Sequence, residues 1–196
     1  MVSAREEMNL LFVEWSNKQV NLFKVELISV ALVTTVPTYT VPLRVVMVLD
    51  AYISRNSGTQ QQTNLVISPL SRSEFASLAN PQNTGQPSQF WFDRLIAPTI
   101  TMYPVPDGNG PYVLNYYACT QMQDANLPGG ETPDIPYRWY DAFVAGLAHR
   151  LSRIYAPELE DKREKNAMDA WKIAATQDTE NVGLSLSPSL QTYYRR

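Results

Sequence analysis

The placement of proline constrains the fold of this chain more than any other feature. Most of its 14 prolines fall between residues 37 and 136, where they cut the chain into runs that suit strands better than long helices. On both sides of this stretch, apolar residues recur at helical spacing. We therefore expect an α+β fold, in which a β-rich region is inserted between an N-terminal helix and two C-terminal antiparallel helices.

The N-terminal helix is predicted from four apolar residues at helical spacing, Met8, Leu11, Phe12 and Trp15. Ser3 and Glu6 have the spacing of a capping box, which would start the helix there. Its amphipathic part is predicted to run from Leu10 to Lys18, with Asn17 marking the end.

Strand-forming residues dominate residues 20–54. Residues 45–53 and 62–67 flank a polar loop that contains glycine, which predicts a β-hairpin. Ser71 and Glu74 form a second capping box, so residues 71–80 are predicted as a short helix that Pro81 ends.

Three further antiparallel strands are predicted at residues 90–94, 99–103 and 112–121. Residues 104–111 hold so much proline and glycine that they are predicted to be only a connecting turn. Together these runs predict a β-sandwich or a curled sheet.

A long helix is predicted to begin near Pro136 and to end at Pro157, where a second helix starts and continues to about Thr176. The predicted apolar stripe of the long helix consists of Tyr140, Phe143, Val144, Leu147, Leu151 and Ile154. We expect the three helices to form a bundle, packed through Trp15, Trp139, Phe143 and Trp171.

These patterns divide the chain into four predicted parts. Residues 1–19 form the first helix of the bundle, and residues 20–133 form the inserted β-rich region. Residues 134–178 form the helix pair that completes the bundle. Residues 179–196 have neither a clear period nor an end cap, and are predicted to form an extended tail.

Composition and charge exclude several classes of protein. The net charge of −3 argues against a protein whose main task is to grip duplex DNA through many phosphate contacts. No apolar run is long enough for a membrane span, and no signal-peptide pattern appears. The single cysteine, Cys119, lies in an apolar run and is predicted to be a buried free thiol of a protein made in a reducing cytoplasm.

Catalytic and cofactor sites are not expected. The only histidine, His149, has no assignable nucleophile and no oxyanion-forming turn near it in sequence. The carboxylates of Glu158, Glu160, Asp161, Glu164 and Asp169 alternate with basic residues, as is typical of a solvated helix face. No zinc spacing or calcium loop is present, so no metal or other cofactor is predicted.

Five short motifs occur in an informative order. They are Glu14-Trp15-Ser16-Asn17-Lys18-Gln19-Val20-Asn21-Leu22-Phe23, Pro81-Gln82-Asn83-Thr84-Gly85-Gln86-Pro87, Gln89-Phe90-Trp91-Phe92-Asp93-Arg94, Tyr103-Pro104-Val105-Pro106-Asp107 and Asp134-Ile135-Pro136-Tyr137-Arg138-Trp139. In this order they resemble the head-to-tail adaptor proteins of tailed bacteriophages, also called connector, packaged-DNA stabilisation or head-completion proteins. The resemblance extends from about Ala4 to Asp178.

The resemblance implies a virion structural protein with no enzymatic activity. About twelve copies would form a ring below the portal protein, extend the DNA channel, retain the packaged DNA and offer a docking surface to the tail. The implied partners are the portal protein, other copies of the chain, a nozzle or tail-tube protein, and packaged double-stranded DNA that passes without sequence-specific contacts; no membrane is involved. The implied location is the head–tail junction of the virion, after assembly in the cytoplasm of the bacterial host.

Two groups of residues are predicted to make these contacts. The resemblance implies that the tail arm binds the portal, through Leu184, Leu186, Leu190, Tyr193, Tyr194, Arg195 and Arg196. Contacts with a neighbouring copy or a tail protein are predicted for Trp91, Asp93, Arg94, Arg55, Asn56, Asp107 and Asn109. In Phe90-Trp91-Phe92 alternate rings must point to opposite faces of a strand, so a second layer or a neighbouring subunit covers one of them.

Relatives carry further helical sequence before the Trp15-Ser16-Asn17 segment. The bundle is therefore expected to be one helix short or to have a face that a neighbour covers. Two other functions remain open from the sequence. One is a virion-associated hydrolase that degrades the cell wall; the other is a ligand-binding module that uses its β-rich region.

Overall fold

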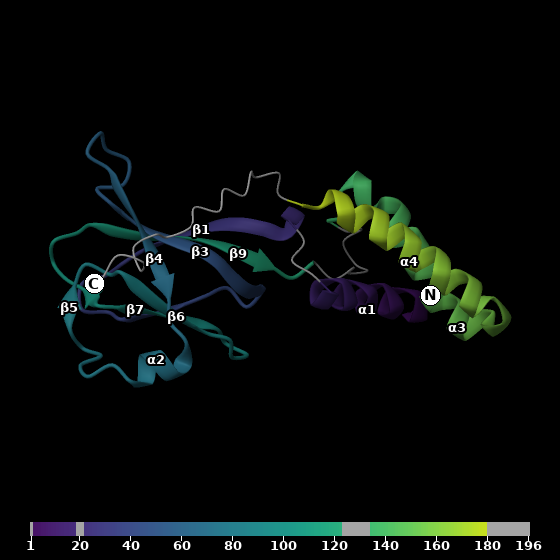
Figure 1. The fold of residues 1–196 in the computed structure, drawn as a ribbon, viewed down its shortest axis with the longest axis horizontal. Helices are drawn as coiled ribbons and strands as arrows, with labels where there is room; N and C mark the ends of the chain where they lie inside the picture. Colours follow the sequence, from purple (N-terminus) through teal and green to yellow (C-terminus); the bar gives the residue numbers. More distant parts are fainter. Residues whose placement is uncertain (1, 19–21, 123–133, 180–196) are drawn as a thin grey trace, which may run out of the picture.

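The computed structural model describes residues 2–18, 22–122 and 134–179. It is an elongated α+β protein, with three helices at one end and a large curled sheet at the other (Figure 1). The strands β1 and β9 lead from the sheet towards the helices. The sheet and the helices each have their own hydrophobic cluster.

The main sheet has seven strands in the order β1-β9-β3-β4-β6-β7-β2. Their bounds are β1 Val25–Ala31, β9 Tyr112–Thr120, β3 Val45–Arg55, β4 Thr63–Pro69, β6 Gln89–Asp93, β7 Thr99–Tyr103 and β2 Thr38–Thr40. The chain enters β1 through the 3-10 helix η1, Leu22–Lys24. The predicted strands are thus present, at nearly the predicted positions.

The predicted hairpin is confirmed. β3 and β4 pair antiparallel, with Ala51 opposite Ile67 and Arg55 opposite Thr63, and the hairpin projects from the body of the sheet (Figure 1). At its tip Asn56 has a φ of 52° and Gly58 a φ of 81°. These left-handed conformations suit asparagine and glycine, which explains the turn chemistry of the loop.

The prediction of an antiparallel region is wrong at two places. β4 and β6 pair parallel, because the chain between them passes through α2, Arg72–Ala76, and such a crossover returns the strand in the same direction. β5, Thr84–Gly85, and β8, Val105–Pro106, also pair parallel, in a separate two-stranded sheet. Residues 104–111 are therefore more than a connecting turn.

The core of the sheet is formed by alternate residues of the central strands. It consists of Val41, Val45, Ala51, Ile53, Ile67, Phe90, Ile100, Met102, Tyr112, Leu114, Tyr116 and Ala118, all nearly inaccessible to solvent. Cys119 points the other way from its neighbour Ala118 and is only half-buried. The prediction that this free thiol is buried is therefore only partly right.

The helices differ from prediction at their ends. α1 spans Val2–Lys18 and so begins before Ser3, which means that Ser3 is not its N-cap. α2 has the predicted capping box between Ser71 and Glu74, but it ends near Ser77, whose hydroxyl donates a hydrogen bond to the carbonyl oxygen of Glu74. The helix is shorter than the predicted residues 71–80.

The C-terminal helices lie close to their predicted positions. η2, Tyr137–Trp139, leads into α3, Tyr140–Tyr155, and η3, Pro157–Leu159, leads into α4, Glu160–Gln177. α3 and α4 pack against each other, and α1 packs against α3. In the part of the chain that the structure describes, no helix is long and apolar enough to cross a membrane.

The predicted apolar stripe of α3 is partly wrong. Phe143 and Leu147 pack against the helical core, but Tyr140, Val144 and Ile154 are exposed. The buried positions include small residues instead, Ala142, Gly146 and Ser152. Small side chains there let neighbouring helices approach closely, which a pattern of large apolar residues does not reveal.

Candidate assembly surfaces

The helices are held together by aromatic contacts that the sequence predicted. The ring centroids of Trp15 on α1 and Trp139 are 5.2 Å apart, and those of Phe12 and Phe143 are 5.8 Å apart. Phe23 also lies 5.7 Å from Trp139. Trp139 is fully buried, so these rings fix α1 and the start of the β-rich region against the C-terminal helices.

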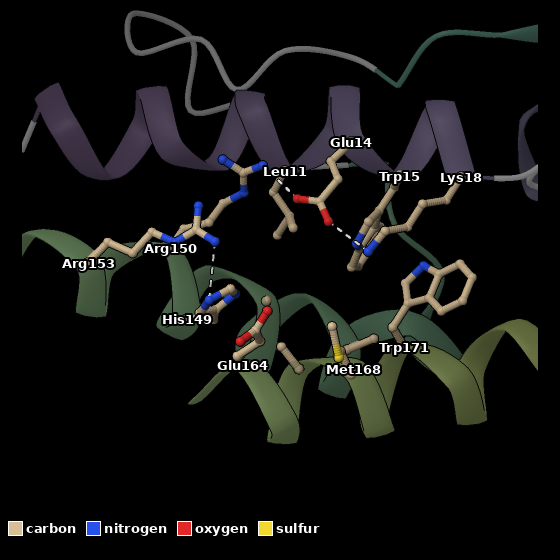
Figure 2. Close-up of a pocket in the computed structure, with 13 residues that line it drawn as sticks. Leu11, Glu14, Trp15, Lys18, His149, Arg150, Arg153, Glu164, Met168 and Trp171 are labelled. Atoms are coloured by element: carbon tan, nitrogen blue, oxygen red, sulfur yellow. Dashed lines mark hydrogen bonds and ion pairs between the residues drawn. The ribbon is translucent and has the colours of Figure 1, made fainter. Parts of the chain in front are cut away.

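A pocket on the α1 side of α3 and α4 is lined by five charged residues, Glu14, Lys18, Arg150, Arg153 and Glu164 (Figure 2). Arg150 of α3 donates to Glu7 at 3.2 Å and to Glu14 at 2.6 Å, both on α1. Lys18 pairs with Glu14 at 2.7 Å and lies 5.1 Å from the ring centroid of Trp171. The pocket therefore contains an ionic network between helices.

Burial raises the pKa of Glu14, but hydrogen bonds from Lys18 and Arg150 lower it more, so the pKa lies below the ordinary value of 4.5. Glu14 is thus held as a carboxylate. Its negative charge balances the guanidinium of Arg150, which is largely buried.

The same pocket is also lined by His149, the only histidine of the sequence. The Nε2 of His149 lies 3.4 Å from a guanidinium nitrogen of Arg153, whose Nε donates to Glu160 at 3.0 Å. These contacts tie the charged residues of α3 to those of α4. Among the described residues, no group of His, Cys, Asp and Glu has an arrangement that could hold a metal ion.

Asp178, just after α4, is a structural contact point that sequence reasoning missed. Its side chain is completely buried, accepts a hydrogen bond from the backbone N–H of Leu22 at 3.0 Å, and pairs with Arg138 at 2.7 Å. It thereby joins the end of α4 to η1 and η2. An aspartate that follows the last apolar position of a helix was the available signal, but its partners are far away in sequence.

A second, partly buried ion pair lies where the sheet meets the helices. Lys24 pairs with Asp134, and the carbonyl oxygen of Lys24 accepts a hydrogen bond from the hydroxyl of Thr120 at 3.1 Å. The pair connects the start of β1 to the segment that leads into α3. Together with Asp178, it ties the two ends of the β-rich region to the helices.

The structure brings four of the predicted interface residues together. Arg55 and Asn56 at the base of the hairpin loop lie beside residues 107–111, and the N–H of Asn56 donates to the carbonyl oxygen of Pro111 at 3.3 Å. Asp107 accepts hydrogen bonds from the backbone N–H of Asn109 at 3.0 Å and from the hydroxyl of Tyr112 at 2.9 Å. We call Arg55, Asn56, Asp107 and Asn109 the loop cluster.

The electrostatics of the loop cluster follow from these contacts. The backbone N–H of Asn109 lowers the pKa of the Asp107 carboxyl, and the nearby charge of Arg55 acts in the same direction. Burial raises the pKa of the Tyr112 hydroxyl, as does its hydrogen bond to Asp107. The cluster is thus an ordered polar surface at one end of the sheet.

The other predicted interface residues, Trp91, Asp93 and Arg94, lie apart from the loop cluster, at the end of β6. Trp91 stacks on Phe75 of α2 with ring centroids 4.8 Å apart, so a second layer of the same chain covers at least part of this ring. Asp93 pairs with Arg72 at 3.4 Å, and Arg94 is exposed.

Exposed apolar residues follow directly after Arg94. Ile96 is 100% exposed, and Leu95 and Leu43 are also exposed nearby, beside a hollow lined by Val41 and Pro98. The sequence analysis did not single these residues out. The tail-arm residues Leu184, Leu186, Leu190, Tyr193, Tyr194, Arg195 and Arg196 lie outside the described residues.

The family of the chain follows from comparison with known proteins. No curated protein is similar enough to the chain to count as a match. The model of the SU10 adaptor protein family matches residues 6–185, which is nearly the whole chain. The chain therefore belongs to the SU10 adaptor protein family, and the predicted resemblance to phage head-to-tail adaptors, a structural rather than an enzymatic class, is confirmed.

Proposed function

We propose that this protein is the head-to-tail adaptor of a tailed bacteriophage. Copies of it, about twelve as the resemblance implies, form a ring below the portal protein, extend the DNA channel, retain the packaged DNA and offer a docking surface to the tail. The observation that carries this proposal is the match of the SU10 adaptor family to residues 6–185. Assembly takes place in the cytoplasm of the host.

The shape of the molecule supports different binding partners for its two ends. The helices share one hydrophobic cluster and the sheet another, in line with the proposed boundaries at residues 19, 133 and 178. In this proposal α1, α3 and α4 act as one bundle that faces the portal and the neighbouring copies. The inserted β-rich region faces a neighbouring copy or the nozzle or tail-tube protein.

The loop cluster is proposed as one contact surface of the β-rich region. The side chains of Asp107 and Asn109 are held by hydrogen bonds within the chain, so these two lose little conformational entropy when they bind. Trp91, Asp93 and Arg94 form a second proposed contact surface. The area around Trp91 is partly covered by Phe75, so Asp93 and Arg94 would make most of the contact there.

The tail arm is proposed to bind the portal. Residues 180–196 combine spaced apolar residues with two terminal arginines, a composition that suits an extended segment bound to a partner. Many identical weak contacts around a ring would add up to a stable attachment. DNA passes through the ring without sequence-specific contacts, in keeping with the net charge of −3.

The test is analytical ultracentrifugation of the chain alone, of the chain with the portal protein of the same genome, and of a variant that lacks residues 180–196. We expect stoichiometric co-sedimentation with the portal, and loss of that complex in the truncated variant. A full-length chain that stays monomeric beside the portal contradicts the adaptor function. A truncated chain that still binds contradicts only the role of the tail arm.

Two alternatives predict different outcomes. For a cell-wall hydrolase, combined replacement of Glu158, Glu160, Asp161 and His149 would abolish lysis while virions still assemble. For a ligand-binding module, the fluorescence of Trp91 and Trp139 would respond to a ligand without a change in mass. The ion pairing of Arg153 with Glu160 supports a structural role for these helix residues instead.

A further inference from the structure

α1 has a stripe of exposed residues on the face that α3 does not cover, and we call it the outer stripe. It consists of Glu6, Leu10, Val13 and Asn17 at helical spacing, with Leu10 50% and Val13 55% exposed, and Val13 and Asn17 also border a hollow beside Val46 and Met122 of the same chain. The buried residues Leu11, Phe12 and Trp15 occupy the opposite face. A helix with apolar residues on both faces has a second partner to cover the outer one.

A groove lies between α3 and α4, on the face of this helix pair that α1 does not cover. Its floor is made of small side chains, with Val144 of α3 and Ile173 of α4, 48% and 66% exposed, at its edges. The residues that line it are Asp141, Val144, Ala145, Ala148, Arg163, Asn166, Asp169, Ala170 and Ile173. An alanine floor between two larger apolar residues is the shape that accepts the side chains of a third helix.

We propose that the outer stripe of α1 in one copy packs into the α3–α4 groove of the next copy. This inference rests on the ring proposed above and names the surfaces that build it. Leu10 and Val13 would fill the space above Ala148 and Ala170. Val144 and Ile173 would flank them, which would remove the largest exposed apolar residues of this groove from water.

Two of the three charged residues that line the groove, Arg163 and Asp141, agree with this placement; the third, Asp169, precedes Ala170 and would face no charged residue of the stripe. The groove has Arg163 towards one end, while Asp141 lies near Ile173 at the other. Seven residues separate Glu6 from Val13, and seven separate Arg163 from Ala170, about 10 Å of helix in each case. One register therefore brings Glu6 beside Arg163 and Val13 over Ala170, and it places the Asn17 amide towards Asp141.

In this register α1 runs antiparallel to α3 of the neighbouring copy. It already runs antiparallel to α3 of its own copy, because Glu7 contacts Arg150 whereas Trp15 contacts Trp139. Each α1 would thus lie between two α3–α4 pairs, that of its own copy and that of the next copy. It would run antiparallel to α3 of both. A contact between two different surfaces of each subunit propagates, and it closes into a ring when each step adds a fixed rotation.

Each contact of this kind is small, with two apolar side chains and one ion pair. A single pair of copies would be held weakly, and stability would come from closing the ring or from the portal as a template. The small size of each contact therefore predicts that two free copies associate only weakly in solution.

A disulfide test decides whether these surfaces meet. In a Cys119→Ser background, Val13→Cys and Ala170→Cys are the pair that this register brings together between copies, whereas within one molecule the two thiols lie on different faces of the helices and cannot reach each other. Oxidation in the presence of the portal is expected to give a ladder of covalent multimers on a non-reducing gel. Each single-cysteine variant, and the matched pair of Val13→Cys with Thr59→Cys in the hairpin loop, should give no ladder.

Charge reversal gives an independent readout. Glu6→Arg and Arg163→Glu are each expected to lower the fraction of chain that co-sediments with the portal about tenfold, and the double variant to restore it. Both positions are exposed, so circular dichroism should show an unchanged fold. A wild-type chain that assembles on the portal while the cysteine pair gives no ladder overturns this interface and leaves the adaptor function standing. A wild-type chain that stays monomeric overturns both.

Discussion

Gly146 of α3 lies so close to Leu11 of α1 that a Cβ on the glycine would stand 3.0 Å from the Cδ1 and 3.1 Å from the Cδ2 of the leucine. A glycine in a helix interior costs about 1 kcal/mol relative to alanine. The close approach of α1 is the structural reason for its presence at this position.

Gly146→Leu is expected to destabilise the protein by about 1–3 kcal/mol, because the new side chain overpacks the contact between α1 and α3. Chemical denaturation followed by circular dichroism measures the change. Ala148→Leu on the groove face of the same helix is the control, and its effect on unfolding should be small. Equal stability of the two variants would contradict the close packing.

Several parts of this fold follow from local sequence and were predictable. The hairpin of β3 and β4 and the capping box of Ser71 and Glu74 depend on residues that are near in sequence. The face of α3 that contacts α1 was predictable only in part, because Phe143 belongs to the predicted stripe whereas Gly146 and Ala142 carry almost no hydrophobic signal.

The features that the sequence did not reveal depend on long-range contacts. The parallel pairing of β4 with β6 requires knowing how the chain returns after α2. The loop cluster was predicted residue by residue, but its assembly from residues 55–56 and 107–109 became visible only in the structure. The burial of Asp178 likewise depends on Leu22 and Arg138, which are distant in sequence.

Trp15→Ala is expected to lower the free energy of unfolding by about 3–5 kcal/mol, since it removes a buried ring from the helical core and leaves a cavity beside Trp139. Tyr137→Ala, at an exposed position one turn away from that core, should change it by less than about 0.5 kcal/mol. Urea unfolding monitored by far-UV circular dichroism compares the two. A small effect at Trp15 would contradict its place in the core.

Asp178→Ala removes the acceptor for the Leu22 N–H and the partner of Arg138. We expect a loss of about 1–3 kcal/mol, because the hydrogen bond from the Leu22 N–H and the charge-assisted pair with Arg138 are both lost. Hydrogen exchange should also rise at the Leu22 amide. Asp169→Ala, on the exposed side of α4, is the comparison and should leave the exchange of the Leu22 amide unchanged. If the Leu22 amide exchanges no faster in Asp178→Ala than in Asp169→Ala, the assignment is refuted.

Glu14 makes stability depend on pH in a defined direction. Its pKa in the folded protein lies below the ordinary 4.5, so its contribution is present above that value and is lost as the pH falls through the lowered pKa. Glu14→Gln should therefore lose less stability than the wild type when the pH is lowered from about 7 to about 3. Urea midpoints across this range provide the test, and parallel curves for the two proteins would contradict it.

The buried side chain of Asp178 also fixes the point from which the C-terminal segment starts. Because it fixes the end of α4 to Leu22 and Arg138, residues 180–196 start from a known point of the molecule. A fully extended chain advances about 3.3–3.6 Å per residue, so this segment can reach no farther than about 60 Å from Asp178. Any portal site that the arm binds must lie inside that radius, which gives a distance against which a docked portal can be judged.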